Sequence, residues 1–304
     1  MYIFGMRKGN DVFRNYHPLV NFLYFTLVLG FSMVLTHPLA QAISAVCAVW
    51  YAVQCEGGKA VLFSLKICLP MLLIAAFMNP AFNHEGLTIL LYFPTGNPLT
   101  LESILYGLSA GTLLATVLMW FVSFNRVIES DKFIYLFGRV IPALSLVLSM
   151  TLRFVPKFKA QMAVVTEAQR GIGRDVSQGS LWQRTKTAVV ILSIMVTWAL
   201  ENAIETADSM KSRGYGLKGR SAFSIYRMDE RDRAALLWFG FSGVYLLAGA
   251  MVSAFGFRYF PGIRYAALDL ATVPFYVIYC AMCATPAVLN ALEERKWRSI
   301  HSRM

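Results

Sequence analysis

Long apolar runs separated by short polar segments dominate the chain. Six of these runs are long enough to cross a bilayer, which takes about 20 residues of α-helix. They are Leu19–Leu35, Leu39–Val53, Ala60–Met78, Leu101–Phe124, Ala234–Phe257 and Leu268–Leu292. Because a helix satisfies its own backbone hydrogen bonds in lipid, this pattern predicts an all-α integral membrane protein with about six transmembrane helices.

Two further apolar runs, Ile141–Leu152 and Val189–Leu200, span 12 residues each. Both are too short to cross a membrane comfortably. If both crossed, residues 153–186 would lie outside with seven Lys and Arg residues, against the tendency of basic loops to remain in the cytoplasm. We therefore expect these runs to belong to long amphipathic helices on the cytoplasmic side, at or under the membrane surface.

The distribution of Lys and Arg also predicts the orientation. Basic residues precede the first run and fill the segment 293–304, whereas residues 79–100 contain neither Lys nor Arg. Arg258 and Arg264 fall on the opposite side, but they are a minority. The pattern predicts a multi-pass protein of the cell membrane with its N- and C-termini in the cytoplasm.

Composition supports the membrane assignment and bears on the partners. Hydrophobic residues make up 57% of the chain and charged residues 15%, whereas a soluble domain is about a quarter charged. Too little polar surface is available to cover a soluble protein, so the lipid bilayer is the expected partner. Residues 153–233 hold 14 of the 28 Lys and Arg, so the net charge of +11 follows membrane sidedness and does not predict nucleic-acid binding.

The sequence offers no set of residues for catalysis, metal binding or a cofactor, and we do not expect an enzyme. Ionisable residues in membrane spans usually mark function, but Lys66, Glu102 and Asp269 lie near the ends of their runs. The segment 214–221 resembles a phosphate-binding loop with Arg in place of the required Lys. A long helix precedes it instead of a strand, so Gly214 is better explained as the left-handed residue that ends that helix.

Two expected cytoplasmic helices end with a similar combination of arginine and glycine. The first ends in Arg170-Gly171-Ile172-Gly173-Arg174, and the second, from about Leu181 to Arg213, ends in Ser212-Arg213-Gly214. A guanidinium at a helix end is a rigid fork of donors that suits carboxylates or carbonyls of a partner. Each end alone is equally explained by a solvated basic terminus, but two such ends from one region favour a two-pronged contact.

At these residues the chain resembles the transmembrane T component of energy-coupling factor (ECF) transporters, which are ABC transporters. Matching motifs in matching order are Tyr16-His17-Pro18-Leu19, Leu152-Arg153-Phe154-Val155-Pro156, Ala168-Gln169 and Ser212-Arg213-Gly214-Tyr215-Gly216. The resemblance covers residues 10 to about 255, and the final span and tail extend beyond the shorter family members. It divides the chain into membrane helices 1–4 at residues 1–125, a coupling-helix region at 126–233, and helices 5 and 6 with a basic tail at 234–304.

The resemblance implies a scaffold for micronutrient uptake that links two ABC-type ATPase subunits to a small membrane substrate-binding subunit. Each coupling helix would end in an Ala-Arg-Gly-like motif that seats in one ATPase. Ser212, Arg213 and Gly214 match the second motif, with Ser in place of Ala. In the first motif Ile172 holds the usual arginine position after Gly171, so Arg170 or Arg174 would take its role, or the ATPase groove would accept an aliphatic side chain.

A stand-alone permease or channel with its own substrate path is the alternative function. Such a path needs polar residues along the spans, and these are sparse. The sequence does not identify the substrate, because in a scaffold subunit of this kind the substrate-binding subunit determines it. The resemblance implies a vitamin or a metal ion.

Overall fold

Helices form most of the chain that the structure describes, and they fall into two compact units. The computed structural model describes residues 11–92, 98–138, 141–217, 226–265 and 269–301. The first unit comprises Met1–Glu129 together with Tyr226–Met304, and the second comprises Ser130–Ile225. Among the described residues, the only strands pair as two short antiparallel ribbons, which the sequence did not predict. The protein is an all-α membrane protein, as expected.

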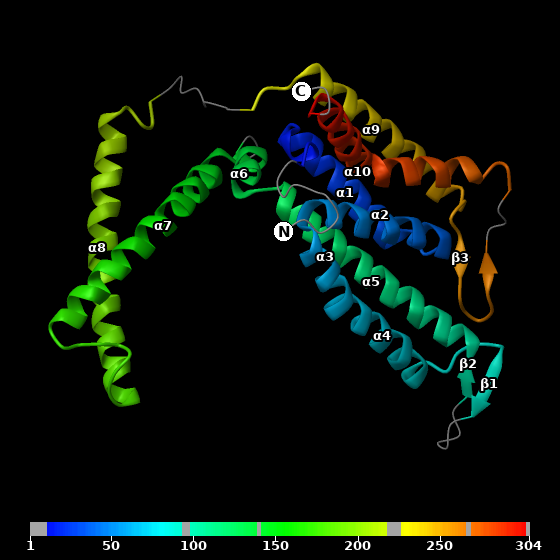
Figure 1. The fold of residues 1–304 in the computed structure, drawn as a ribbon, viewed down its shortest axis with the longest axis horizontal. Helices are drawn as coiled ribbons and strands as arrows, with labels where there is room; N and C mark the ends of the chain where they lie inside the picture. The colour runs from blue at the N-terminus through cyan, green and yellow to red at the C-terminus, as the bar shows by residue number, and fades with distance from the viewer. Residues whose placement is uncertain (1–10, 93–97, 139–140, 218–225, 266–268, 302–304) are drawn as a thin grey trace. The chain divides into compact units, whose positions relative to one another are not determined.

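The first unit is a bundle of apolar helices (Figure 1). In chain order its helices and strands are η1 (Phe13–Asn15), α1 (Pro18–Val34), α2 (Pro38–Glu56), α3 (Gly58–Phe63), η2 (Ser64–Cys68), α4 (Leu69–Phe82), β1 (Ile89–Tyr92), β2 (Pro98–Thr100), α5 (Leu101–Val127), α9 (Glu230–Met251), β3 (Phe257–Arg258), β4 (Arg264–Tyr265) and α10 (Val273–His301). Proline at the first position of α1 and α2 favours helix initiation, because its missing N–H has no partner there in any case.

Aromatic side chains fill the core of this unit. Tyr24 of α1, Tyr51 of α2, Trp120 of α5 and Phe239 of α9 are fully buried; the rings of Tyr24 and Trp120 meet edge to face, and the other ring contacts are tilted. The final helix α10 belongs to the same core, since the Tyr24 hydroxyl donates a hydrogen bond to the Cys283 carbonyl at 3.0 Å. The last span is therefore an integral part of the bundle.

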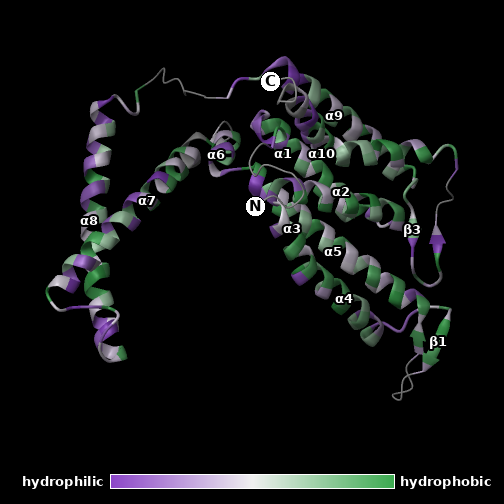
Figure 2. Cartoon of the chain, in the orientation of Figure 1, coloured by the Kyte–Doolittle hydropathy of each residue, from purple (hydrophilic) through white to green (hydrophobic). Residues whose placement is uncertain are grey.

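Two glycines allow α5 to approach α4 closely. Gly107 and Gly111 lie one helical turn apart in a G-x-x-x-G pattern, which lets membrane helices bring their backbones together. A Cβ at Gly107 would lie 2.8 Å from the Ala75 carbonyl oxygen, and one at Gly111 would lie 3.0 Å from Leu72 Cα. Figure 2 shows that both helices are predominantly apolar along their visible sides, as suits helices exposed to lipid.

The second unit contains α6 (Ser130–Gly138), α7 (Pro142–Gly171) and α8 (Leu181–Ser212). The sequence did not predict α6. Helix α7 continues through Pro156, where a helix commonly ends or kinks. Ser180 caps α8, because its hydroxyl accepts a hydrogen bond from the Gln183 backbone N–H at 3.4 Å.

By length and apolar composition, six described helices can cross a membrane: Pro38–Glu56, Gly58–Phe82, Leu101–Val127, Leu181–Ser212, Glu230–Met251 and Val273–Lys296. The number agrees with the expectation, but the set differs. Helix α1 has 17 residues and falls just below that length, and α8 qualifies in its place. The expectation that the apolar run of α8 is too short to cross is therefore wrong on length and composition. Its cytoplasmic placement stays a prediction from charge, as do the domain boundaries.

Candidate functional site at the ends of α7 and α8

Helices α7 and α8 cross and share a small apolar core of their own (Figure 1). Val165 of α7 packs with Ile191 and Met195 of α8, and all three are buried. Phe158 and Trp198 are partly buried against them. The two long helices are therefore held together near one crossing point.

An aromatic and cationic contact extends this crossing. The rings of Phe154 and Phe158 lie 5.6 and 6.3 Å from the Trp198 ring, centroid to centroid. Lys157 Nζ donates a hydrogen bond to Asn202 Oδ1 at 2.5 Å and lies 5.6 Å from the centre of the Trp198 ring. Phe154 belongs to the motif Leu152–Pro156, for which the sequence indicates no role. In the structure this residue helps to join the two helices.

Both helices end in the same backbone structure, a Schellman motif. At the end of α7, Gly173 N–H donates to the Arg170 carbonyl at 3.0 Å, and Arg174 N–H donates to the Gln169 carbonyl at 2.9 Å. Gly173 has φ +80°, in the left-handed region that glycine adopts without strain. Two of the carbonyl groups that a helix end leaves unpaired accept hydrogen bonds in this way.

The end of α8 has two backbone hydrogen bonds at the equivalent positions. Gly214 N–H donates to the Lys211 carbonyl at 3.0 Å, and Tyr215 N–H donates to the Met210 carbonyl at 3.0 Å. Gly214 also has φ +80°, which confirms its predicted left-handed conformation. Residues 218–225, which include the second half of the segment resembling a phosphate-binding loop, lie outside the described residues.

This equivalence places Ile172 and Arg213 at the same position. Each is the C-cap residue directly before the left-handed glycine, with φ and ψ of −95° and 16° for Ile172 and −82° and 7° for Arg213. The sequence predicts the same correspondence, because Ile172 holds the position of the usual arginine in the first motif. Both side chains are exposed, Ile172 at 66%. The role of either residue in binding a partner stays a prediction.

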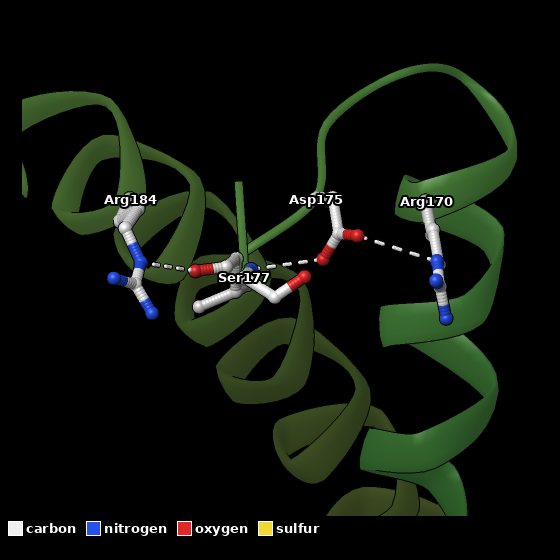
Figure 3. Close-up of polar contacts among 5 residues, drawn as sticks. Arg170, Asp175, Ser177 and Arg184 are labelled. Atoms are coloured by element: carbon white, nitrogen blue, oxygen red, sulfur yellow. Dashed lines mark hydrogen bonds and ion pairs between the residues drawn. The ribbon is translucent and has the colours of Figure 1, made fainter. Parts of the chain in front are cut away.

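The first helix end carries its own counter-charge (Figure 3). Arg170 Nε lies 3.3 Å from Asp175 Oδ2, and Arg184 Nε donates to the Val176 carbonyl at 2.7 Å. Asp175 Oδ1 accepts the Ser177 backbone N–H at 2.9 Å. Hydrogen bonds from Ser177 hold the pKa of Asp175 below its usual value, and the nearby Arg170 and Arg184 act in the same direction. Asp175 is therefore ionised at neutral pH and compensates the charge of Arg170.

Sequence reasoning missed Asp175 and Arg184. The contact between Arg170 and Asp175 passes from the last turn of a helix into a loop, where the helical spacing of three or four residues does not apply. At the second end, within the described part of the chain, no ion pair or side-chain hydrogen bond engages the guanidinium of Arg213. Ser212 Oγ donates to the Ser209 carbonyl at 2.9 Å and so stays within its own helix.

The motif at residues 16–19 has a structural position in the other unit. His17 Nδ1 accepts the Leu19 backbone N–H at 3.3 Å, and the His17 backbone N–H donates to Asp232 Oδ1 at 3.2 Å. Asp232 in turn forms a capping box with Asp229 at the start of α9. This motif therefore joins the starts of α1 and α9.

A hydrogen-bonded network that sequence reasoning missed lies around Asp11. Its carboxylate accepts the Tyr51 hydroxyl at 2.8 Å and the Asn290 side-chain amide at 2.9 Å. The Val12 backbone N–H donates to Asn290 Oδ1, also at 2.9 Å. No motif spacing connects residues so far apart in the chain. Among the described residues, no three His, Cys, Asp or Glu side chains gather as metal ligands would.

Comparison with known proteins connects this arrangement to one group of transporters. No protein-family model matches the chain. The energy-coupling factor transporter transmembrane protein EcfT of Thermosediminibacter oceani is 27% identical over 262 residues, which are 81% of this chain and 95% of that protein. The chain resembles EcfT. The resemblance that the sequence motifs indicated is thereby confirmed.

Other EcfT proteins match a shorter part at higher identity. Those of Lactobacillus helveticus and Bacillus selenitireducens are 35% and 34% identical over 97 and 112 residues. These matches cover 32% and 36% of this chain. The chain thus spans only 35% and 40% of the length of these two relatives.

Proposed function

We propose that the chain is the scaffold of an ECF-type importer in the cell membrane. In this role it transmits the ATP-driven movement of two ABC ATPases to a small membrane subunit that binds the substrate. The observation that carries the proposal is the pair of helix ends with identical caps on one crossed helix pair. Two equivalent ends suit a partner that presents two equivalent docking sites, as a pair of ATPases does.

The crossed helices suit the transmission of movement. The buried contacts of Val165, Ile191 and Met195 fix the crossing, and each helix extends beyond it as a rigid arm. At a rise of 1.5 Å per residue, about 27 Å separates Met195 from Arg213 and about 10 Å separates Val165 from Ile172. A displacement at the end of α8 is therefore connected to the crossing through one continuous helix.

The roles of the side chains follow from their chemistry. The guanidinium of Arg213 offers a planar set of donors to carboxylates or carbonyls of one ATPase. The second ATPase receives the end of α7, with Ile172 at the equivalent position. ATP binds to the ATPases, the substrate binds to the membrane subunit, and a vitamin or a metal ion is the expected substrate class. Both termini of the chain then lie in the cytoplasm.

A charge reversal at Arg213 tests the proposal. Arg213→Glu in the complete complex should reduce copurification of the ATPases at least about tenfold, because it replaces attraction with repulsion at a desolvated contact. Uptake of the substrate by cells should fall with it, while the amount of inserted chain stays unchanged. Lys186→Glu is the matched control, since Lys186 is an exposed cation near the other end of the same helix.

Unchanged copurification and uptake in Arg213→Glu would contradict the role of Arg213. Substrate flux through liposomes that contain this chain alone, without ATPases or a second membrane protein, would instead support the stand-alone permease.

A further inference from the structure

The short ribbon between α9 and α10 carries two arginines directly opposite each other. Strands β3 and β4 pair in an antiparallel register in which Arg258 faces Arg264 and Phe257 faces Tyr265. Side chains of directly opposite residues lie on the same face of a ribbon, with their Cβ atoms about 5 Å apart. Successive residues alternate between the two faces, so this ribbon has one cationic face and one aromatic face.

The aromatic face holds the ribbon against the helices of the first unit. The Phe257 ring lies 5.5 Å from the His37 ring at the start of α2, centroid to centroid, and 4.5 Å from the Tyr259 ring. The loop of the ribbon is fixed at α5, where the ring of Tyr106 lies 5.5 Å from that of Tyr259 and 5.3 Å from that of Phe260. The cationic face lies opposite to the face that packs on the bundle, and both arginines are exposed.

The two arginines have no counter-charge among the described residues. Neither Arg258 nor Arg264 takes part in an ion pair there. The segments outside the described residues contain neither Asp nor Glu. Like charges directly opposite each other destabilise the pairing of two strands. The pair also lies on the expected external side, against the tendency of basic residues to remain in the cytoplasm. A bound anion would offset the repulsion and give the two arginines a role at this position.

The residues around the ribbon are those of a membrane interface. Exposed apolar side chains flank it in the chain, at the end of α9 and around the start of α10: Met251, Val252, Leu270 and Val273. Aromatic rings such as those of the ribbon are typical of the level of the lipid headgroups. Figure 2 shows hydrophilic positions in this ribbon beside the apolar helices of the same unit. A phospholipid fits this combination, because its phosphate suits the planar donors of two guanidinium groups and its acyl chains cover the apolar side chains.

We propose that Arg258 and Arg264 bind the phosphate of an anionic phospholipid in the external leaflet of the membrane. A headgroup with net negative charge, such as that of phosphatidylglycerol, is preferred over phosphatidylcholine, because the choline cation is repelled by the arginines. The bound lipid fixes the connection between α9 and α10 at the membrane surface. This inference is independent of the proposed function, since it involves neither the ATPases nor the substrate.

Photo-crosslinking with labelled lipids tests this site. The full chain is placed in phosphatidylcholine nanodiscs with a small fraction of phosphatidylglycerol that carries a diazirine in its acyl chain, and mass spectrometry locates the crosslinks. Labelling of residues 251–273 should fall about tenfold in the double variant Arg258→Gln/Arg264→Gln, because the charge-assisted hydrogen bonds to the phosphate are lost. Labelling of the basic segment 293–304, on the expected cytoplasmic side, should stay unchanged and is the internal control.

Two further arms separate recognition of the headgroup from simple exposure to lipid. Phosphatidylcholine with the same diazirine acyl chain should label residues 251–273 equally in the parent and in the double variant, which also shows that the variant is folded. Equal labelling by phosphatidylglycerol in both proteins would overturn the proposal. Loss of that labelling in the parent when inorganic phosphate is added in excess would also overturn it, since the pair would then bind a soluble anion.

A protein partner with acidic side chains is tested in membranes of the host. A benzophenone amino acid replaces Ile263, which is exposed in the loop between the two strands. The proposal expects crosslinks to lipid at this position. A crosslink to an acidic segment of a membrane protein would overturn the lipid site, and it would leave the proposed function intact.

Discussion

Two histidines, His17 and His37, begin the first two membrane helices in the same way. Each precedes a proline, and each Nδ1 accepts the backbone N–H two residues further on at 3.3 Å. Burial lowers the pKa of both imidazoles, and the carboxylate of Asp232 partly opposes this effect at His17. A protonated Nδ1 cannot accept a hydrogen bond, so both caps require the neutral ring.

The cap at His17 predicts a loss of stability in acid. A histidine with a lowered pKa in the folded state binds fewer protons there than in the unfolded state, so stability is complete above about pH 6.5 and falls as the pH drops below it. Thermal unfolding of the detergent-solubilised protein between pH 8 and pH 5 measures this. His17→Asn keeps a capping side chain that does not titrate and should flatten the dependence. An equally steep dependence in His17→Asn would contradict the assignment.

At the scale of helices, hydropathy predicts which segments form apolar helices. It does not predict where a helix begins or ends when local hydrogen bonds set that boundary. Helix α5 begins at Leu101, as expected, because the Thr100 hydroxyl caps it. Helix α10 begins at Val273 and not at Leu268, because the Thr272 side chain binds the Asp269 backbone in a turn. The apolar residues on both sides of Pro156 do not show whether one helix continues through it. In the structure α7 continues, and residues on both sides of Pro156 pack against α8.

At the candidate site, too, the sequence predicts some features and misses others. Arginine and glycine at a helix end are visible in sequence, so Arg213 and Gly214 were predicted. The ion pair of Arg170 with Asp175 depends on how the loop folds back, and hydropathy carries no information on that.

Close packing of α4 on α5 predicts a specific cost at Gly107. Gly107→Ala places a methyl group 2.8 Å from the Ala75 carbonyl oxygen, so the helices must separate, at a cost of about 1–3 kcal/mol. The midpoint of thermal unfolding in detergent should fall by roughly 2–4 °C per kcal/mol. Gly30→Ala is the control, because nothing lies within 4 Å of a Cβ there. A fall of equal size in Gly30→Ala would show that close packing is not the cause.

At the scale of the whole molecule, charge and hydropathy must be weighed against each other. Helix α8 is long and apolar enough to cross a membrane, yet seven Lys and Arg residues lie between positions 153 and 186. Because basic loops tend to stay in the cytoplasm, we place the loop between α7 and α8 there. With that placement, our proposal assigns the coupling role to the compact unit Ser130–Ile225.

Cysteine labelling tests this topology. Ser177→Cys in that loop should react with a membrane-impermeant maleimide only after the cells are opened, whereas Glu85→Cys in the expected external loop should react in intact cells. Both positions are exposed. The parent chain, with its five native cysteines, gives the background for each measurement. Labelling of Ser177→Cys in intact cells would place α8 across the membrane.

The stoichiometry of the complex tests the central claim most directly. Native mass spectrometry of the assembly purified through this chain in mild detergent measures it without knowledge of the substrate. The account predicts one copy of this chain with two ABC-type ATPases and one small membrane protein. A chain recovered alone, or only as copies of itself, from membranes that retain uptake activity would contradict it.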